Sequence, residues 1–572
     1  MPELIMPIGF EGGISNKSSI LLDENEMQTC SGLVYDKMGI LKCRPTRTAV
    51  NATAVGSIHT LSRYINWLLE GDGSSIRYKW DLNGYCDLYT PADENFTLMG
   101  SLESSSRLSV ADYVNWMFFV NGRDIKAMTK GNLYEWGVLA PSYAPTAASS
   151  GSGTIDGAYT IYYTYYVKFP NGEVVESGPS PSGSFTASTD DTVAWGSIQA
   201  CPYTGTGIIA WRRLYRTVSG VAYHIATIKD NTTTTYSETY TDAQVQAFSS
   251  MDCLYYDVPP AGLTQIEYYL QRVWGIAGNT LYPSEAYLPF NFNPLRTLAV
   301  CDEDEELKTL KKWGDQLYMA PERTWFRLQG NDPDTWGIKN TFADAGVING
   351  HTVKVTKYGI LGLWYDGLYV FDGSVSRNIT ADKIGKSLFL DTISDVNACY
   401  AEWDGRCYNF YYPTSGTTIS QCLTIDFAAY PNLRFYNDDF IATAHHYHVP
   451  TGIRYLGKSN GYQYEEAGSA ETIATSNRSA SKHGGNIFLR KDLQALWYDI
   501  NTNSKDVIVS FYVDGTLQTH TETINCASRT RKRITSIPHW EGYWFDIALS
   551  CADSSSLEIY SPWALIANTA GT

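Results

Sequence analysis

The densest group of side chains that could bind a metal or transfer protons is His445-His446-Tyr447-His448. Alternate residues of a β-strand point to the same face, so His446 and His448 would lie together. A metal centre needs three or four converging ligands, and no acidic or cysteine residue occurs at a matching spacing. The pattern therefore favours an ordinary polar strand over a metal site.

Two acidic segments could in principle bind a cation. Residues 302–306, Asp-Glu-Asp-Glu-Glu, lack the glycine and the regularly spaced oxygen ligands of a calcium loop, which indicates a solvated turn. Residues 331–336, Asn-Asp-Pro-Asp-Thr-Trp, faintly resemble the Asp-box turn of sialidase propellers. The Asp-box glycine is missing and the segment occurs once, so a structural turn is the better interpretation.

The short sequence motifs of common enzymes are either missing or lack the structural context they need. The chain contains no HExxH of zinc proteases and no GxGxxG segment between a strand and a helix. The GxSxG pattern of serine hydrolases matches residues 457–461, and the GxxxxGK[ST] pattern of P-loops matches residues 452–459, but both lie in a predicted blade hairpin and not between a strand and a helix. The sequence therefore predicts no enzymatic activity and no catalytic, cofactor-binding or metal-binding residue.

One basic cluster, Arg529, Arg531, Lys532 and Arg533, lies between predicted strands near the C-terminus. Most runs of this kind form a solvated edge of a sheet. The other interpretation is a contact with an acidic partner surface. Both interpretations stay open from the sequence.

The net charge limits the partners of this chain. Its 572 residues include 60 acidic and 43 basic side chains, which gives a formal charge of -17. Such a surface repels a nucleic-acid backbone, so we expect no tight non-specific DNA binding. The N-terminal residues do not resemble a secretory signal, and no stretch approaches the roughly 20 apolar residues of a spanning helix. No membrane anchor is expected.

Composition predicts an all-β chain that folds in a reducing compartment. Aromatic residues make up 14% of the sequence, and 47 glycines and 22 prolines separate them, which is typical of many short strands joined by tight turns. The eleven cysteines are an odd number and form no CxxC pair. We therefore interpret them as scattered reduced thiols.

The chain contains an internal repeat. Tyr-Ile-Asn-Trp at 64–67 returns as Tyr-Val-Asn-Trp at 113–116, and glycine hairpins then recur around tyrosines spaced by 36, 51, 39 and 56 residues. A hairpin every 40–50 residues is typical of four-stranded propeller blades, and the aromatic residues would pack between blades. We expect about seven blades, at 57–96, 97–140, 263–302, 303–348, 349–392, 393–436 and 437–467.

The remaining segments predict accessory domains. Residues 1–56 are expected to be an extended N-terminal arm leading into the propeller, whose first part is 57–140 and second part 263–467. Residues 141–262 open on a Pro/Ser/Ala/Gly stretch that resembles a linker, and then alternate strands with tight turns, which predicts an inserted fibronectin/Ig-like β-sandwich. Residues 468–572 predict a C-terminal β-sandwich that includes an Asp-Gly hairpin.

The N-terminal segment resembles a known family. Residues 9–16, Gly-Phe-Glu-Gly-Gly-Ile-Ser-Asn, and residues 32–45, which end in Cys43-Arg44-Pro45, are similar to the start of tail nozzle proteins of short-tailed bacteriophages. Cys43 replaces the usual Lys or Arg before Arg-Pro. Residues 365–373 resemble a blade hairpin of this group, and the order of domains is similar over most of the chain.

The resemblance implies a structural role in a virion. Nozzle proteins form a ring, usually a homohexamer, below the portal and the adaptor, and the ring closes the tail until DNA leaves through it. The implied partners are further copies of the chain, the adaptor protein and tail fibres or spikes, and assembly would take place in the host cytoplasm. The candidate assembly contacts are Phe10, Gly12, Gly13, Arg44, Pro45, Arg529, Arg531, Lys532 and Arg533. Deleting residues 1–30 would then leave a folded chain that does not assemble.

A second function class stays open. Exposed Trp and Tyr side chains stack on sugars, and propellers with accessory sandwiches also occur in glycosidases, so the chain could instead bind or cleave carbohydrate. Hydrolysis would require two carboxylates about 5–9.5 Å apart in a pocket, an arrangement that spacing in a sequence does not reveal.

Overall fold

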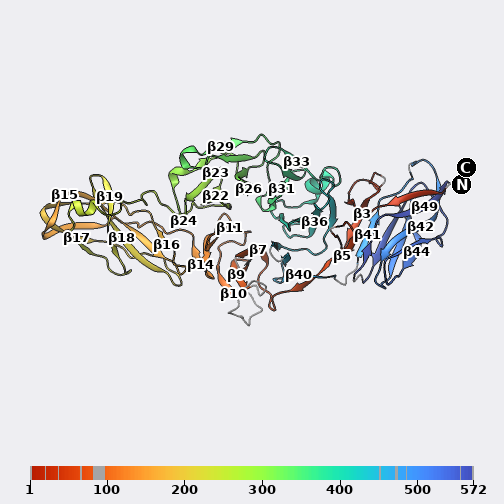
Figure 1. The fold of residues 1–572 in the computed structure, drawn as a ribbon, viewed down its shortest axis with the longest axis horizontal. Helices are drawn as coiled ribbons and strands as arrows, with labels where there is room; N and C mark the ends of the chain where they lie inside the picture. The colour runs from red at the N-terminus through yellow and green to blue at the C-terminus, as the bar shows by residue number, and fades with distance from the viewer. Residues whose placement is uncertain are drawn as a thin grey trace. The chain divides into compact units, whose positions relative to one another are not determined.

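The computed structural model describes residues 3–19, 21–36, 38–64, 67–80, 97–449, 452–470, 475–484, 486–553 and 556–569. Strands account for 52% of the chain and helices for 4%, which confirms the predicted all-β class. The strands form a six-bladed β-propeller arrangement with accessory β domains (Figure 1). The chain divides into two compact units: residues 1–73, 79–96 and 342–572 form the first, and residues 74–78 and 97–341 the second.

Within the described residues, six sheets are separate blades of antiparallel strands. Each blade follows the chain from its first to its last strand, except that the last blade takes its fourth strand from the N-terminal segment. The blades are β7 (Ile58–Tyr64), β8 (Trp67–Asp72), β9 (Ser75–Trp80) and β10 (Thr97–Ser101); β11 (Ser109–Tyr113), β12 (Trp116–Val120), β13 (Ile125–Thr129) and β14 (Asn132–Glu135); β21 (Gln265–Tyr269), β22 (Arg272–Ala277), β23 (Thr280–Glu285), β24 (Leu288–Phe292) and β25 (Leu298–Ala299); β26 (Thr309–Trp313), β27 (Gln316–Ala320), β28 (Phe326–Gln329) and β29 (Gly337–Asn340); β30 (Lys354–Thr356), β31 (Gly359–Trp364), β32 (Gly367–Phe371) and β33 (Ser376–Asn378); and β38 (Ala444–His448), β39 (Ile453–Gly457), β40 (Gln463–Ala470) and β6 (Pro45–Ala49).

Six separate blades are one fewer than the seven expected from the repeat. The difference is the segment 393–436, which forms the four-stranded meander β34 (Tyr400–Trp403), β35 (Cys407–Tyr412), β36 (Gln421–Asp426) and β37 (Arg434–Asn437). This meander has the pattern of a blade, but β37 also pairs with β2 (Gly13–Ile14), so it continues into a ten-stranded sheet.

The boundary between the first two blades also differs from the expected one. Residues 97–101 pair with β9 and so belong to the first blade, of which residues 81–96 lie outside the described residues.

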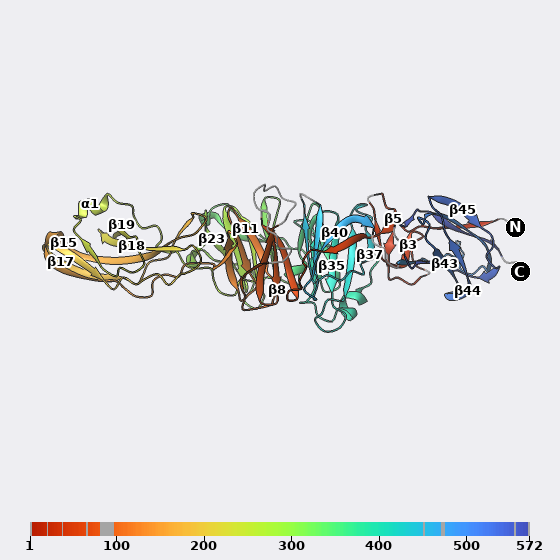
Figure 2. The same ribbon diagram turned by 90° about the horizontal axis from the view of Figure 1, so that it is seen from below.

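The C-terminal sandwich is built from both ends of the chain, and red N-terminal strands lie among blue C-terminal ones in Figure 2. Residues 1–56, expected to be an extended arm, supply strands to both of its sheets and β6 to the last blade. One sheet contains β1 (Leu4–Ile8), β49 (Trp563–Thr569), β42 (Lys491–Asn501), β48 (Glu558–Ile559), β5 (Leu41–Cys43), β4 (Leu33–Tyr35), β45 (Thr530–Ile534) and β46 (Trp540–Gly542). The other contains β2, β3 (Glu26–Ser31), β41 (Thr475–Ser479), β47 (Phe545–Cys551), β43 (Val507–Val513) and β44 (Thr516–Ile524).

The inserted domain lies in the second unit. It consists of β15 (Thr146–Lys168), β16 (Val174–Glu176), β17 (Gly183–Gly196), β18 (Ile209–Val218), β19 (Val221–Ile228), β20 (Tyr236–Glu238) and the short helix α1 (Asp242–Gln246). The stretch 140–153, which the sequence suggests to be a linker, is largely part of β15. Small Ala and Ser side chains lie extended there and pair with β17, so composition alone was misleading.

The insert shares its hydrophobic core with two blades. Trp116 of β12 is fully buried, and its ring centroid lies 4.8 Å from that of Phe169 in the insert and 4.6 Å from that of Phe290 in β24. The Trp116 indole N–H donates to the carboxylate of Glu173 in the insert. Removing the insert would therefore uncover Trp116 and Phe290, which makes the insert part of the folded blades and not an independent attachment.

Candidate functional site

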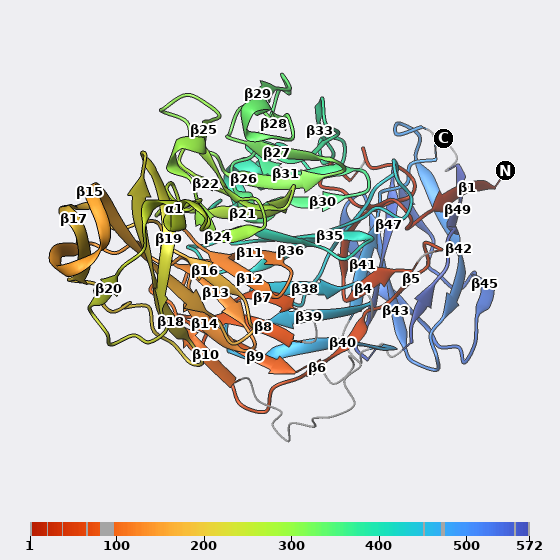
Figure 3. The same ribbon diagram turned by 60° about the vertical axis from the view of Figure 1, so that its left-hand side comes forward.

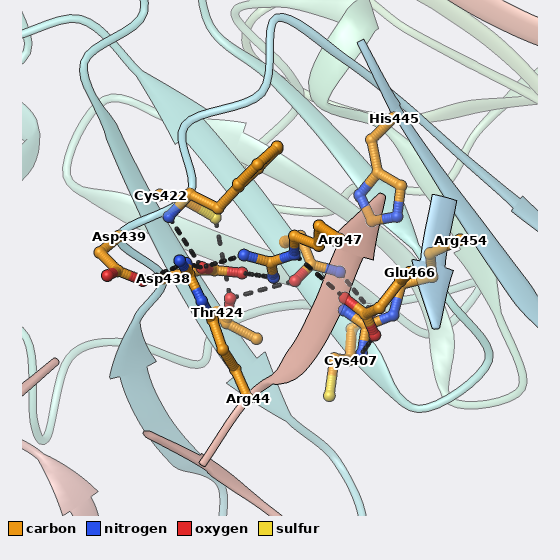
Figure 4. Close-up of polar contacts among 12 residues, drawn as sticks. Arg44, Arg47, Cys407, Cys422, Thr424, Asp438, Asp439, His445, Arg454 and Glu466 are labelled. Atoms are coloured by element: carbon orange, nitrogen blue, oxygen red, sulfur yellow. Dashed lines mark hydrogen bonds and ion pairs between the residues drawn. The ribbon is translucent and has the colours of Figure 1, made fainter. Parts of the chain in front are cut away.

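The most elaborate polar site of the first unit is a buried cluster of ion pairs where β6 completes the last blade. We call it the ionic clasp and define it by Arg44, Arg47, Arg454, Asp438, Asp439, Glu466 and Asp404 (Figure 4 labels all but Asp404). β6 follows β40 in the order β38-β39-β40-β6, and the four strands lie side by side in Figure 3. Strand pairing places Arg47 opposite Glu466, so the register of β6 sets the geometry of the clasp.

Arg47 is the centre of the clasp. Its Nη1 donates to Asp438 Oδ1 at 3.0 Å and its Nη2 to the other oxygen of Asp438, which gives a bidentate pair. Its Nε lies 3.3 Å from Glu466 Oε2. The side chains of Arg47 and Asp438 are 2% and 8% exposed, so both ions of this pair are withdrawn from water.

The other members extend the pairing to neighbouring elements. Arg44 pairs with Asp439 and lies 3.4 Å from Asp438 Oδ1, while Arg454 of β39 lies 3.1 Å from Glu466 Oε1. Arg454 Nε also lies 3.5 Å from Asp404 Oδ2, in the turn between β34 and β35. The clasp thus connects the N-terminal segment, the last blade and the neighbouring meander.

An aromatic ring completes the packing. The guanidinium of Arg47 lies 4.6 Å from the ring centroid of Phe440, and the ammonium of Lys458 lies 3.9 Å from it. Cation–π contacts of this kind add of order 1 kcal/mol when they are partly desolvated. Phe440 is itself anchored, because its backbone N–H donates to Asp438 Oδ1 at 2.9 Å.

The electrostatics of the clasp are those of a structural site. Burial acts to raise the pKa of Asp438, but the charge and hydrogen bonds of Arg47 outweigh burial and hold this pKa below its ordinary value of 3.8. The same pairing raises the pKa of Arg47 despite its burial. Asp438 and Arg47 therefore hold each other in the ionised form, and this pair offers neither a nucleophile nor a general acid.

The predicted N-terminal contact residues are satisfied inside the chain. Phe10 is buried, with its ring centroid 5.8 Å from that of Trp563 and its N–H 3.1 Å from Ser561 Oγ. Gly13 has φ of +78° and pairs with Phe435, where a Cβ would lie 2.3 Å from the Phe435 nitrogen, so only glycine fits. A Cβ on Gly12 would lie 2.7 Å from the Asn25 carbonyl oxygen, and Pro45 is the first residue of β6, next to Arg44.

The predicted basic cluster is mostly paired within the C-terminal sandwich. Arg529 binds Asp499 through both oxygens, at 2.8 and 2.6 Å, and Arg531 contacts the same carboxylate. Arg533 lies 2.8 Å from Glu3. Lys532 is exposed on β45. The cluster is thus a sheet edge in which most of the positive charge is already matched.

The histidines of β38 form no metal centre. His445 is buried, and its Nδ1 lies 3.2 Å from the hydroxyl of Tyr411. Burial, with the nearby charge of Lys354, lowers the pKa of His446 to about 3, so this imidazole is neutral at physiological pH. Across the part of the chain that the structure describes, no group of three or more His, Cys, Asp or Glu side chains could hold a metal ion.

The two acidic segments are turns. Residues 302–306 are largely exposed and contain the turn hydrogen bond from Glu305 N–H to the Asp302 carbonyl. In the second segment Pro333–Thr335 form a short 3-10 helix, and the Trp336 ring centroid lies 4.8 Å from that of Trp274. Packing of Trp336, rather than sugar or cation binding, explains the tryptophan of this segment.

One carboxyl group of the second unit has an unusual environment. Burial raises the pKa of Asp112, on the first strand of its blade, to about 6. The Asp112 side chain is nevertheless exposed to solvent, and no ion pair is assigned to it among the described residues. Because the folded-state pKa exceeds the ordinary 3.8, the ionised carboxylate destabilises the fold progressively as pH rises from about 4 to 6.

Replacing this group tests its titration. We expect Asp112→Asn to raise the free energy of unfolding at pH 7.5 by up to about 1 kcal/mol, after discounting for solvent access, and to leave it unchanged at pH 3.5. Denaturant unfolding at the two pH values measures the difference. The exposed Asp334→Asn serves as the control, and an equal effect of Asp112→Asn at both pH values contradicts the expectation.

Comparison with known proteins leaves the family open. No family model and no curated protein matches the chain. Among solved structures, the WD40 domain of Neurospora crassa Pan2 is 6% identical with a TM-score of 0.25, covering 73% of this chain and 94% of that one. A B. thetaiotaomicron one-component-system extracellular domain is 9% identical, with a TM-score of 0.20 and coverage of 100% and 99%. A glycoside hydrolase is 10% identical, with a TM-score of 0.16 and coverage of 80% and 96%. At these TM-scores none of the three bears on function.

Two further observations concern the surroundings in which the chain could work. No helix among the described residues is long and apolar enough to cross a membrane. The ten described cysteines are free thiols, and eight of them are buried. Burial raises the pKa of several, including Cys407 and Cys422 of the meander β34–β37, so these thiols are inert at neutral pH.

Proposed function

We propose that this chain is a structural virion protein, the tail nozzle of a short-tailed bacteriophage. The observation that carries the proposal is the path of residues 4–49, which contain the family-like segments. These residues supply strands to both sheets of the C-terminal sandwich and close the last blade through the ionic clasp. Because the N-terminal segment pairs with both the sandwich and the last blade, a force that separates these domains must break several strand pairings. This suits a protein that bears mechanical load during DNA release.

The pairing of the charged groups also supports a structural role. The clasp and the Asp499 cluster hold their charged groups in ion pairs within the chain. Six copies of a chain with a formal charge of -17 would present an acidic ring, past which a polyanion slides without being held. The proposed partners are further copies of the chain, the adaptor and tail fibres or spikes.

Co-sedimentation with the portal–adaptor complex of the proposed parent phage tests the proposal. The purified chain should sediment with the complex and stay in the supernatant without it. DNA affinity supplies a second test. At 150 mM salt, the dissociation constant of DNA from the isolated chain should be no lower than about 10⁻⁴ M, the weak end of non-specific binding. Failure to join the adaptor, or submicromolar DNA affinity, would overturn the nozzle assignment.

A further inference from the structure

The first unit carries an aromatic cluster that neither the clasp nor the proposed nozzle role uses. Tyr358 lies in the turn between β30 and β31, and Phe427 and Tyr430 lie in the connection between β36 and β37. The three ring centroids are 4.5 to 6.1 Å apart, and the ring planes differ by only 10–30°. Trp403, at the end of β34, meets Phe427 edge-on at 5.3 Å.

The cluster is layered from the core to the surface. Phe427 is 1% exposed and forms the base, whereas Tyr430 is 43% exposed at the outer side. The Tyr358 hydroxyl donates to the Phe427 carbonyl at 3.2 Å, which fixes the orientation of its ring. We call Tyr358, Phe427, Tyr430 and Trp403 the aromatic shelf. Stacking and the Tyr358 hydrogen bond restrain the rings, so stacking of a ligand on Tyr430 would cost little side-chain entropy there.

Among the described residues, Lys357 supplies a cation at the edge of the shelf. The Lys357 ammonium is 4.9 Å from the Tyr358 ring centroid, and the residue is exposed. The neighbouring cations are engaged: Lys354 pairs with Glu402 at 2.6 Å, and Arg406 pairs with Asp426 through two contacts. Lys357 is therefore the shelf cation that is positioned to meet an anionic group on a bound molecule.

We propose that the aromatic shelf binds an acidic saccharide, a pyranose that carries one carboxylate such as a uronic or sialic acid. One face of a pyranose presents C–H groups that pack on an aromatic ring, here Tyr430, while its carboxylate lies within reach of Lys357. A single lysine matches a single carboxylate. A nucleic acid would instead bring several phosphates to a chain with a net charge of -17, which disfavours it.

The inference does not depend on the nozzle role, because it concerns a surface site of the isolated chain. Its test is saturation-transfer NMR and calorimetry with 3′-sialyllactose and digalacturonic acid as acidic probes, lactose as the neutral probe and a ten-residue oligothymidylate as the nucleic-acid probe. We expect the acidic sugars to bind more tightly than lactose. The oligothymidylate should not bind.

Two variants locate the site. Tyr430→Ala should weaken binding of the acidic sugars by about tenfold, and Lys357→Gln should weaken it by about threefold, toward the level of lactose. The matched controls are Tyr255→Ala, a tyrosine that is 54% exposed in the second unit, and Lys229→Gln, an exposed lysine there. Both controls should bind like the parent chain. Near-UV circular dichroism checks that each variant is folded.

Three outcomes would overturn the proposal. The first is that none of the three sugars binds the parent chain. The second is that Tyr430→Ala binds the acidic sugars as well as the Tyr255→Ala control does. The third is that the oligothymidylate binds and is lost in Tyr430→Ala, which would reassign the shelf to nucleobase stacking. None of these outcomes bears on whether the chain joins the adaptor.

Discussion

Deleting residues 1–30 should unfold the C-terminal sandwich, not merely prevent assembly. The deletion removes β1, which pairs with β49 from Leu4 to Ile8. The strand β2, which joins β37 to β3 within the ten-stranded sheet, is lost as well. It also removes Phe10, whose ring covers Trp563 in the core. Loss of one buried phenylalanine alone costs about 3–5 kcal/mol, a large part of a typical domain stability of 5–15 kcal/mol.

Hydrogen exchange measures this effect segment by segment. Backbone amides of β49 and β41 should lose protection in the truncated chain, while amides of β26–β29 in the second unit should keep it. Deleting only residues 1–3 is the matched control, since it removes the exposed Glu3–Arg533 pair and no described strand. A truncated chain with native protection in β49 would show that residues 1–30 are an arm, as their sequence suggests.

Replacing Arg47 by methionine should destabilise the first unit by about 3–5 kcal/mol. Methionine keeps the apolar stem but leaves the Asp438 and Glu466 carboxylates buried without their main counter-ion, and an uncompensated buried charge is costly. The shift of the denaturant unfolding midpoint measures the loss. Because the pKa of Asp438 is held below 3.8, the contribution of the clasp is present above that pH and falls as pH drops below it.

An exposed ion pair provides the comparison. Arg377 lies 3.4 Å from Asp372, and the two side chains are 68% and 38% exposed, so Arg377→Met should cost less than about 1 kcal/mol. The double change Arg47→Met with Asp438→Leu should recover part of the lost free energy of unfolding, because it removes one buried carboxylate together with its counter-ion. If Arg47→Met costs no more than Arg377→Met, the clasp does not hold β6 in place.

The propeller could be predicted from the sequence because its hairpins repeat. The unequal spacing of the repeated tyrosines is explained only by the structure. Tyr282, Tyr369 and Tyr464 lie on the third strands of their blades, in β23, β32 and β40, whereas Tyr318 and Tyr408 lie on second strands, in β27 and β35. The interval from a third strand to the next second strand is 36 or 39 residues, and the reverse interval is 51 or 56. The hairpin motif therefore alternates between two positions in successive blades.

The clasp could not be predicted from the sequence. Arg47 and Glu466 are 419 residues apart, and each follows an unremarkable alternating pattern. The family resemblance includes the Arg44-Pro45 dipeptide but not Arg47. The role of Arg47 depends on pairing of β6 with β40, which closes the blade. Strand pairing between distant segments leaves no local signal beyond the period of two.

Local patterns misled where the partner of a segment came from far along the chain. The N-terminal residues lack hairpins and so suggest an arm, although β1 pairs with β49 and β3 with β41. The basic cluster suggests a docking edge, although Asp499 of β42 neutralises Arg529 and Arg531. In both cases the sequence does not reveal which distant strand lies next to the segment. Tertiary packing determines that neighbour.

Electron cryo-microscopy of the chain bound to its portal–adaptor complex tests the nozzle assignment most directly. The nozzle assignment predicts a closed ring of this chain, of six copies as the family resemblance implies. The ring should be coaxial with the adaptor and should surround an opening that is wide enough for DNA after the ring opens. Few Lys or Arg side chains should line that opening, since each phosphate neutralised adds a salt slope of about -0.9 and slows passage. A map in which the chain is absent from the adaptor, or bound there as a single peripheral copy, would contradict the nozzle assignment.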